Sequence, residues 1–132
     1  MFSSQTTIEV RYAETDAMGV VHHSVYAVWF EQARVQGLRT QGLPYQDIEA
    51  QGYSLPVVRL EVEYLKPARF GDIVTVSMHL SKEGASRFRF DYEVHCGVDL
   101  LVRGKTLHGF TRQGKACRPP QEFLRILDKL IN

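Results

Sequence analysis

The feature that most constrains the fold is one long helical segment that is apolar on several sides. Between residues 24 and about 41, apolar side chains recur at helical spacing in two neighbouring stripes, which further valines extend: Val25, Trp29 and Ala33; Tyr26, Phe30 and Ala33; Val28 and Val35. A helix with so wide an apolar surface is usually buried on several sides. We therefore expect a central helix, with the Ser24 hydroxyl as its N-cap and Gly42 as its stop.

Strand-like segments flank this helix in the sequence. Apolar and polar residues alternate, as in strands with one buried face, over residues 7–12, 56–65, 73–80 and 86–96. A less regular strand covers about 100–112, where Gly104 and Gly109 indicate bulges. Residues 82–85 and 97–99 are short enough for hairpin loops. A short helix is expected from Pro44 to Gly52, and a closing helix over 120–131 with an apolar stripe of Phe123, Ile126, Leu127, Leu130 and Ile131.

These elements predict an α+β fold. Successive hairpins produce an antiparallel sheet with one buried face, and the helix at 24–41 is the segment best able to cover that face. The pattern by itself does not separate one topology from other α+β arrangements. The length of 132 residues fits one compact domain.

Composition and charge argue against several functional classes. Sixteen basic and fifteen acidic residues give a formal net charge of +1, whereas nucleic-acid-binding domains are normally clearly basic. No apolar stretch has the length of a membrane span or the layout of a signal peptide. Cys96 and Cys117 match no zinc or redox spacing, which indicates free thiols in a reducing compartment. We expect a cytoplasmic protein without a nucleic-acid or membrane partner.

The segment that carries chemistry is the loop between the first strand and the central helix. It presents Asp16 and contains Gly19, which permits a tight turn. Because the helix begins near Ser24, unpaired N–H groups and the positive end of the helix dipole lie at residues 22–25. A carboxylate facing such a helix end suits acyl chemistry, since the N–H groups hold an oxyanion while the carboxylate attacks a carbonyl or activates water.

Simpler interpretations exist for the same residues. Asp16 could cap a turn, and His22 and His23 could be surface histidines at a helix start. Neighbouring histidines point in different directions and neither has a carboxylate at i+4, so we expect no metal site. The sequence holds neither a Gly-x-Ser-x-Gly elbow nor a phosphate-binding glycine loop, and we expect no cofactor.

Four other side chains near this loop are assigned structural roles. Glu31 and Arg34 are three residues apart on the helix, a spacing at which an ion pair is routine. Tyr12 and Trp29 fit a core better than a ligand-stacking site. None of these four assignments requires a bound substrate.

The loop and the helix start resemble the signature of a known family. The stretch Tyr12-Ala-Glu-Thr-Asp16-Ala-Met-Gly19-Val-Val-His-His23-Ser-Val-Tyr26, followed by Phe30-Glu31-Gln-Ala-Arg34, is similar to that of 4-hydroxybenzoyl-CoA thioesterase-type hotdog proteins. The branch it resembles most is the YbgC-like acyl-CoA thioesterases. A second stretch, Val62-Glu-Tyr-Leu-Lys-Pro-Ala-Arg-Phe-Gly-Asp72, looks like the second marker of the family. The likeness covers residues 8 to about 112, and the two motifs together are specific, whereas a lone Asp-x-x-Gly is not.

The resemblance implies a hotdog fold, a curved antiparallel sheet wrapped around a long central helix, as one thioesterase domain over residues 1–132. It implies a homodimer or homotetramer that hydrolyses an acyl-CoA at the subunit interface. Asp16 matches the catalytic carboxylate, the His23 N–H matches the group that polarises the thioester carbonyl, and Tyr12 matches a tyrosine lining the site. His22 departs from the pattern of the branch, which leaves open whether the acyl group is aryl (4-hydroxybenzoyl or 1,4-dihydroxy-2-naphthoyl) or short to medium fatty acyl.

Substrate-binding residues are expected around this loop. Gly19 belongs to the turn that shapes it. Because CoA carries phosphates, Lys66 and Arg69 are the candidates at the pocket mouth, with Arg87 and Arg103 behind them; a solvated rim is the alternative. The sequence leaves Asp16 as either nucleophile or general base, and it leaves two competing functions: a non-catalytic acyl-thioester binding protein and a hotdog dehydratase or hydratase.

Overall fold

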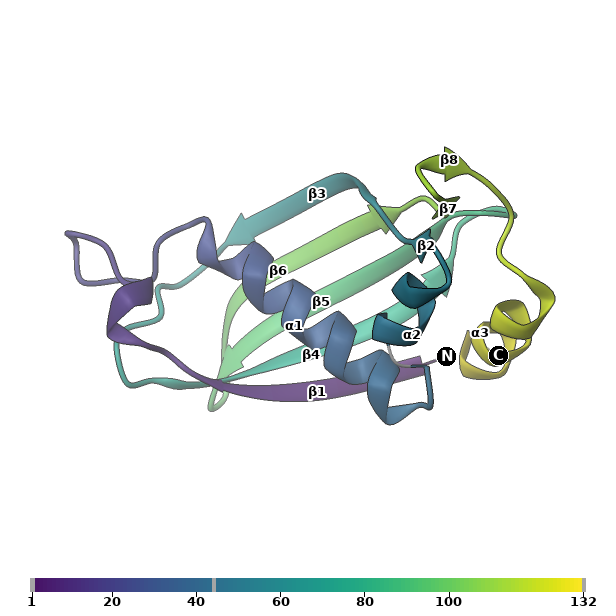
Figure 1. The fold of residues 1–132 in the computed structure, drawn as a ribbon. Coiled ribbons are helices and arrows are strands. Elements are labelled where there is room, and N and C mark those ends of the chain that lie inside the picture. Colours follow the sequence, from purple (N-terminus) through teal and green to yellow (C-terminus); the bar gives the residue numbers. More distant parts are fainter. Residues whose placement is uncertain (1, 44, 132) are drawn as a thin grey trace.

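A sheet of five antiparallel strands wraps around one helix (Figure 1). The computed structural model describes residues 2–43 and 45–131. The strands follow the order β1-β4-β5-β6-β3, and their bounds are Phe2–Glu9 for β1, Val57–Tyr64 for β3, Ile73–Lys82 for β4, Phe88–Cys96 for β5 and Asp99–His108 for β6. The helix α1, Val25–Thr40, crosses the concave face of the sheet. This is the predicted α+β arrangement.

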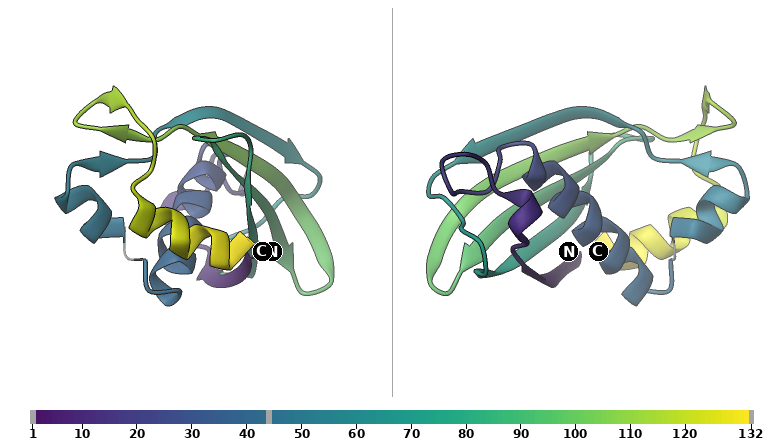
Figure 2. Two further views of the ribbon diagram at one scale, coloured as in Figure 1. Left: turned by 90° about the vertical axis from the view of Figure 1, so that its right-hand side faces the viewer. Right: turned by 60° about the vertical axis from the view of Figure 1, so that its left-hand side comes forward.

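Smaller elements gather at one end of the sheet (Figure 2). They are the helices α2, Tyr45–Ala50, and α3, Gln121–Ile131, and the three-stranded sheet β2-β7-β8, with bounds Tyr53–Ser54, Thr111–Arg112 and Lys115–Ala116. The small sheet was not predicted, because two-residue strands carry no alternation. The predicted helix start at Pro44 lies outside the described residues, as does the side chain of Leu130. None of the described helices is long and apolar enough to cross a membrane.

The core confirms the predicted helix and the two predicted central strands. The inward residues of β4 and β5 are all at most 2% exposed: Val74, Val76, Met78, Leu80, Phe88, Phe90, Tyr92 and Val94. They pack beneath Trp29, Phe30 and Ala33 of α1, which are at most 1% exposed. The alternating apolar residues of the strands therefore pack against the wide apolar surface of the helix.

Strand β3 alternates as predicted but is largely exposed. Val58, Leu60 and Tyr64 lie on its apolar face, and their exposed fractions are 51%, 46% and 51%. β3 is the last strand of the sheet order and pairs only with β6 among the described strands. An apolar edge strand with unpaired backbone groups is a surface that another chain can cover.

The prediction of bulges at Gly104 and Gly109 is wrong. The strand register shifts between Val57 and Arg59 and between Val94 and His95, whereas Gly104 pairs in register with both neighbouring strands. Gly104 instead makes room for Phe30, whose ring would clash with any added Cβ. Gly109 follows the last residue of β6.

The first strand is displaced from its predicted position. It begins at Phe2 and ends at Glu9, rather than spanning residues 7–12. Tyr12 opens the short 3-10 helix η1, Tyr12–Glu14, and is 72% exposed beside Phe70, with ring centroids 5.6 Å apart. The predicted core position of Tyr12 is therefore wrong, because the chain turns before it.

A chain of hydrogen bonds runs through the core beneath α1. His108, 1% exposed, lies within 2.9 Å of the Leu55 carbonyl through Nδ1 and 2.8 Å of Thr106 Oγ1 through Nε2. Since a carbonyl only accepts, Nδ1 carries the proton and Nε2 accepts from Thr106. Tyr92 donates to Thr106 at 2.7 Å and accepts from Arg34 Nη1 at 3.1 Å. With a neutral His108, each hydrogen of this chain thus meets an acceptor.

His108 is expected to make stability depend on pH. Burial lowers the pKa of His108 from 6.5 to about 4, although the bond to the Leu55 carbonyl acts in the opposite direction. Between these two values the unfolded chain binds the proton more readily, so stability falls as pH falls. We expect the free energy of unfolding to drop by about 2 kcal/mol from pH 7 to pH 5 on account of this residue.

Urea unfolding at the two pH values, at one protein concentration, measures this drop. Carboxylates with ordinary pKa values titrate mainly below this window. His79→Gln, a change at an exposed histidine, should keep the pH dependence, and His108→Gln should flatten it. An equal slope in all three proteins would contradict the assignment.

Candidate active site

The loop that carries Asp16 is a small hairpin closed by backbone hydrogen bonds. The Asp16 N–H donates to the Val20 carbonyl at 2.9 Å, and Thr15 bridges to Val21. At its tip the Gly19 N–H donates to the Asp16 carbonyl at 3.0 Å, and Gly19 has a φ of 76°. Glycine adopts this left-handed conformation at little cost, which explains its place in the turn.

The Asp16 carboxylate uses only one of its oxygens within the protein. Oδ1 accepts from the Met18 N–H at 2.8 Å, so Asp16 does cap a turn, as the simpler interpretation proposed. Among the residues that the structure describes, none donates a hydrogen bond to Oδ2. The turn thus orients the carboxylate and leaves one oxygen available.

The turn before α1 presents a free N–H group. The His22 N–H donates to the Glu14 carbonyl at 2.9 Å, whereas the next N–H, that of His23, has no acceptor in the described part of the chain. Ser24 occupies the N-cap position, but its hydroxyl bonds the His22 ring at 2.8 Å rather than a helix N–H. The predicted Ser24 capping bond is therefore wrong, because His22 competes for the hydroxyl and itself accepts from the Ser24 N–H at 3.2 Å.

Asp16 and His23 line one cavity of about 290 Å³. The remaining lining residues come from the loop, the first turn of α1, the end of β3 and the segment after it: Val20, Val21, Tyr26, Tyr64, Leu65, Lys66 and Pro67. Most are apolar or aromatic, which suits an acyl group. The positive end of the α1 dipole lies at the same cavity, so an anion that forms there is favoured.

Tyr64 joins the edge strand to the helix start. Its hydroxyl donates to the His23 carbonyl at 2.8 Å, and its ring meets that of Tyr26 edge-on at 5.6 Å. In the sequence, Tyr64 is one apolar residue of an alternating strand. A bond between residues 41 positions apart leaves no local signal that could have revealed this role.

Glu14 was also missed, and it lies beside the catalytic candidates. It is 6% exposed and accepts from the Trp29 indole at 2.9 Å and from the Arg11 N–H at 2.8 Å. Burial raises the pKa of this carboxyl, but hydrogen bonds from Arg11 and Trp29 and the Arg11 charge together outweigh burial and leave the pKa below its usual value. Glu14 is therefore ionised at neutral pH. The Arg-x-x-Glu spacing was the one available signal, as a capping-box-like pattern.

The predicted substrate-binding residues separate into two groups. Lys66 lines the cavity with Asp16 and pairs with Asp99 at 3.1 Å. Tyr12, Gly19 and Arg69 do not line it within this chain. Gly19 still shapes the turn that holds Asp16, and Tyr12 and Arg69 are exposed beside the loop and in the turn after β3.

The two basic residues expected behind them lie elsewhere. Arg87 precedes β5, and the start of β5 pairs with the Lys82 end of β4. The Asp16 loop instead follows Glu9, which pairs with Ile73 at the other end of β4, about 30 Å away along ten residues of strand. Arg103 lies between Glu63 and Glu93 on the outer face of the sheet, at 3.6 and 3.8 Å.

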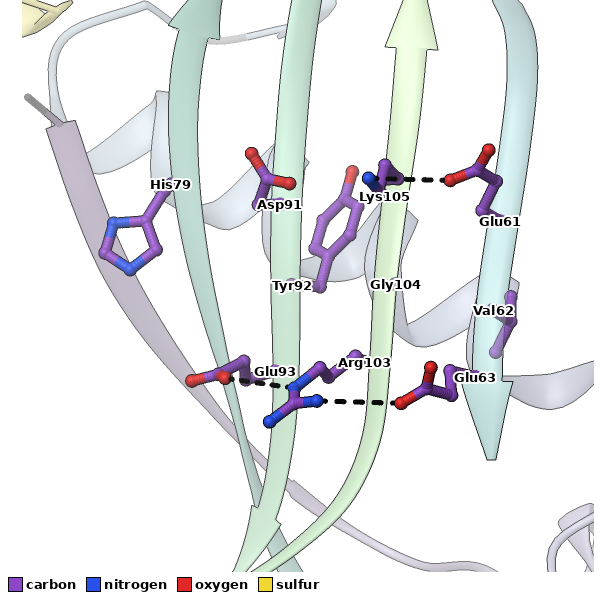
Figure 3. Close-up of a pocket in the computed structure, with 10 residues that line it drawn as sticks. All are labelled: Glu61, Val62, Glu63, His79, Asp91, Tyr92, Glu93, Arg103, Gly104 and Lys105. Atoms are coloured by element: carbon purple, nitrogen blue, oxygen red, sulfur yellow. Dashed lines mark ion pairs between the residues drawn. The ribbon is translucent and has the colours of Figure 1, made fainter. Parts of the chain in front are cut away.

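That outer face forms a second hollow of about 670 Å³ (Figure 3). Four carboxylates surround two basic side chains in it: Glu61, Glu63, Asp91 and Glu93 around Arg103 and Lys105. Figure 3 shows Arg103 between two glutamates and Lys105 beside a third. An excess of negative charge does not suit the phosphates of CoA, so the candidate site remains the smaller cavity at Asp16.

The helix does not form the predicted Glu31–Arg34 pair. No ion pair joins them within the described chain, and Arg34 donates to the Tyr92 hydroxyl instead. Arg34 faces the sheet, where a buried acceptor competes successfully with an exposed carboxylate. The predicted core position of Trp29 is confirmed by its exposed fraction of 1%.

Among the described residues, no three side chains of histidine, cysteine, aspartate or glutamate gather in a way that could hold a metal ion. The rings of His22 and His23 lie 4.1 Å apart, but His22 is bonded to Ser24.

Known proteins share this fold and much of this sequence. Residues 10–127 match the model of the thioesterase-like superfamily. The acyl-CoA thioester hydrolase YbgC of Escherichia coli O6:H1 is 34% identical over 95 residues, which cover 72% of this chain and 71% of that protein. A hypothetical protein from Thermus thermophilus has a crystal structure with a TM-score of 0.95 and 45% identity, and 99% of each chain is covered. The DHNA-CoA thioesterase of Staphylococcus aureus gives 0.92 and 34%, over 98% of this chain and 91% of that one.

The match extends over nearly all of the chain and includes both predicted motifs. It confirms the predicted hotdog fold and the predicted enzyme class, a thioester hydrolase. The chain therefore belongs to the thioesterase-like superfamily.

Proposed function

We propose that this chain hydrolyses the thioester of an acyl-CoA to the free acid and CoA, at the cavity shared by Asp16 and His23. One observation carries the proposal. A carboxylate with a free Oδ2 lines the same cavity as the first turn of α1, where the His23 N–H has no acceptor among the described residues. These are the two groups that thioester hydrolysis requires, a base or nucleophile and an oxyanion donor.

The proposed reaction divides the work between these groups. The His23 N–H and the helix dipole polarise the thioester carbonyl and hold the oxyanion. Asp16 Oδ2 either attacks the carbonyl carbon or takes a proton from the water that does. The C–S bond then breaks, and CoA leaves as the thiolate. If Asp16 is the nucleophile, a water then hydrolyses the acyl–aspartyl anhydride, which releases the free acid and restores the carboxylate. The Tyr64 hydroxyl, bonded to the His23 carbonyl, holds the peptide that follows the oxyanion donor.

Relatives support acyl-CoA as the substrate class. The Escherichia coli protein is named an acyl-CoA thioester hydrolase, and the Staphylococcus aureus structure is described as a DHNA-CoA thioesterase. The first name covers acyl groups in general and the second an aryl group. Both substrate types therefore belong in the tests of this chain.

A homodimer or homotetramer is part of the proposal. The apolar edge of β3 is exposed, and its end residues lead directly into Leu65 and Lys66 of the cavity. A second copy that paired along β3 would cover this edge and border the cavity.

Lys66 is proposed to contact a CoA phosphate. Replacing Lys66 by alanine is expected to raise the KM for acyl-CoA about five- to tenfold, the loss of about 1 kcal/mol, and to leave kcat unchanged. Steady-state kinetics with one acyl-CoA measures both constants. Arg87→Ala, at the far end of the sheet, is the matched control and should leave KM unaltered. If Lys66→Ala and Arg69→Ala both kept the wild-type KM, neither residue would bind the phosphates.

Isotope incorporation tests the role of Asp16. In water enriched in oxygen-18, a single turnover through an anhydride intermediate places the label in the Asp16 carboxylate, provided that water attacks the aspartyl carbonyl; attack at the acyl carbon labels only the acid. Mass spectrometry of the Asp16 peptide after repeated turnovers reads the result. Label in the peptide supports the nucleophile. Label in the acid alone counts against an anhydride that water opens at the aspartyl carbonyl.

A further inference from the structure

Glu14 is a buried carboxylate that the proposed chemistry does not use. Its two oxygens are both occupied: Oε1 accepts from the Arg11 N–H at 2.8 Å, and Oε2 accepts from the Trp29 indole at 2.9 Å and from Arg11 Nη2 at 3.4 Å. Buried ionised groups are normally retained only when such bonds satisfy them. Glu14 therefore needs these partners. Its position at the base of the Asp16 hairpin indicates that these bonds hold the hairpin in place.

Both ends of the Asp16 hairpin meet at Glu14. Its carbonyl accepts from the His22 N–H at 2.9 Å, directly before the free N–H of His23. On the other side, Glu14 stands two residues before Asp16 in the sequence. Glu14 therefore connects the Asp16 carboxylate, through the backbone, to the turn of residues 22–24 that presents the His23 N–H, which we call the oxyanion turn.

The side chain of Glu14 connects this hairpin to the body of α1. Trp29 is 1% exposed and packs edge-on against Tyr26 at 5.0 Å, so its indole N–H is a rigid donor. The hairpin tip is solvated, with Ala17, Met18 and Gly19 exposed. Apolar burial cannot fix the position of such a tip, and polar bonds at its base have to do so.

We propose that Glu14 is a positioning residue, which through Trp29 and the His22 N–H fixes the Asp16 carboxylate relative to the oxyanion turn of α1. The inference rests on the proposed function, because it states how the Asp16 carboxylate and the His23 N–H are held at a fixed position relative to each other. A shift of about 1 Å between such groups can cost about a hundredfold in rate. Glu14 itself touches neither the substrate nor the reacting atoms.

Glu14→Gln is the sharpest test, because it preserves the shape of the side chain but replaces one hydrogen-bond acceptor by a donor. Both oxygens of Glu14 accept from N–H donors. The NH2 group of glutamine must take the place of one oxygen, so one hydrogen bond is lost where two donors face each other. We expect kcat to fall about ten- to hundredfold, with the KM for acyl-CoA within twofold and an unchanged shape of the pH profile. Glu31→Gln, the same chemical change at an exposed position of α1, is the matched control and should keep wild-type kcat.

Trp29→Phe provides a second, independent variant. It removes the indole donor and keeps an aromatic ring in the core. Because both changes break the same bond, the double variant Glu14→Gln, Trp29→Phe should lose less in kcat than the product of the two single losses. Losses that multiply would show that Glu14 and Trp29 act separately, and the proposal would be wrong.

Amide hydrogen exchange tests the positioning without reference to catalysis. In Glu14→Gln, or in Trp29→Phe if the first variant does not fold, the N–H groups of Asp16, Met18 and His22 should exchange at least about tenfold faster, and those of β4 and β5 should not change. Unchanged exchange in the hairpin would overturn the proposal, whatever happens to kcat. Faster exchange in a protein whose wild type has no thioesterase activity would retain the positioning role and reject the proposed function instead.

Discussion

Replacing Asp16 by asparagine is expected to lower kcat about 10²- to 10⁴-fold, with little change in stability. Asparagine keeps the oxygen that accepts from the Met18 N–H, so the turn is preserved. It loses the negative charge that the proposed reaction requires as nucleophile or base. Steady-state release of CoA measures the loss, and binding of a non-hydrolysable acyl-CoA analogue should persist. The variant thus separates the turn-capping role of Asp16 from its chemical role.

Asp72→Asn is the matched control for this prediction. Asp72 also caps a turn, since its carboxylate accepts from the Arg69 N–H at 2.9 Å, but it does not line the cavity. Its replacement should leave kcat near the wild-type value. Retained activity in Asp16→Asn, or an equal loss in both variants, would contradict a chemical role for Asp16.

Replacing Gly104 by alanine is expected to destabilise the fold by about 3 kcal/mol. A Cβ at this position would clash with Cε2 and Cζ of the Phe30 ring. The ring cannot yield easily, because Phe30 is 0% exposed and stacks on Tyr92 at 4.3 Å. Relief of the clash therefore requires α1 to move away from the sheet, which weakens the packing between them. Urea unfolding at one protein concentration measures the change in free energy.

A nearby glycine serves as the comparison. A Cβ at Gly109 would lie 3.8 Å from Val58 and 3.9 Å from Pro56, which is ordinary contact. Gly109→Ala should therefore change stability by less than about 1 kcal/mol. Adding Phe30→Leu to Gly104→Ala should recover part of the loss by freeing space. Equal stability of Gly104→Ala and Gly109→Ala would show that helix and sheet are not in the tight contact described.

The long helix and the central strands were predictable because their periodicities are strong and local. Alternation over 73–80 and 86–96 and the wide apolar surface of residues 24–41 each identify an element without reference to its partners. The edge position of β3 was not predictable in this way, since its alternation resembles that of β4. Only the sheet order shows that α1 leaves Val58 and Leu60 uncovered. The role of Gly104 was missed for the same reason, because Phe30 is distant in sequence.

The site shows the same division between local and distant signals. The Asp16 turn and the helix start near Ser24 follow from short-range patterns, and the structure places both at one cavity. Glu14 and Tyr64 contribute through bonds to Trp29 and His23, which are 15 and 41 positions away. Single-sequence patterns contain no information about such pairs. Charge alone also misplaced Arg87 and Arg103, because it does not show which end or face of a sheet a residue occupies.

The most direct test of the proposed function is the release of CoA by the purified wild-type protein. A panel of aryl and fatty acyl-CoA thioesters, followed with a thiol reagent, measures it, and the Asp16→Asn variant runs beside it as the blank. We predict turnover of at least one member by the wild type and little or none by the variant. The best substrate then identifies the acyl class. No turnover on any member, with acyl-CoA still bound, would contradict the account and would favour a non-catalytic acyl-thioester binding protein in which Asp16 only caps a turn.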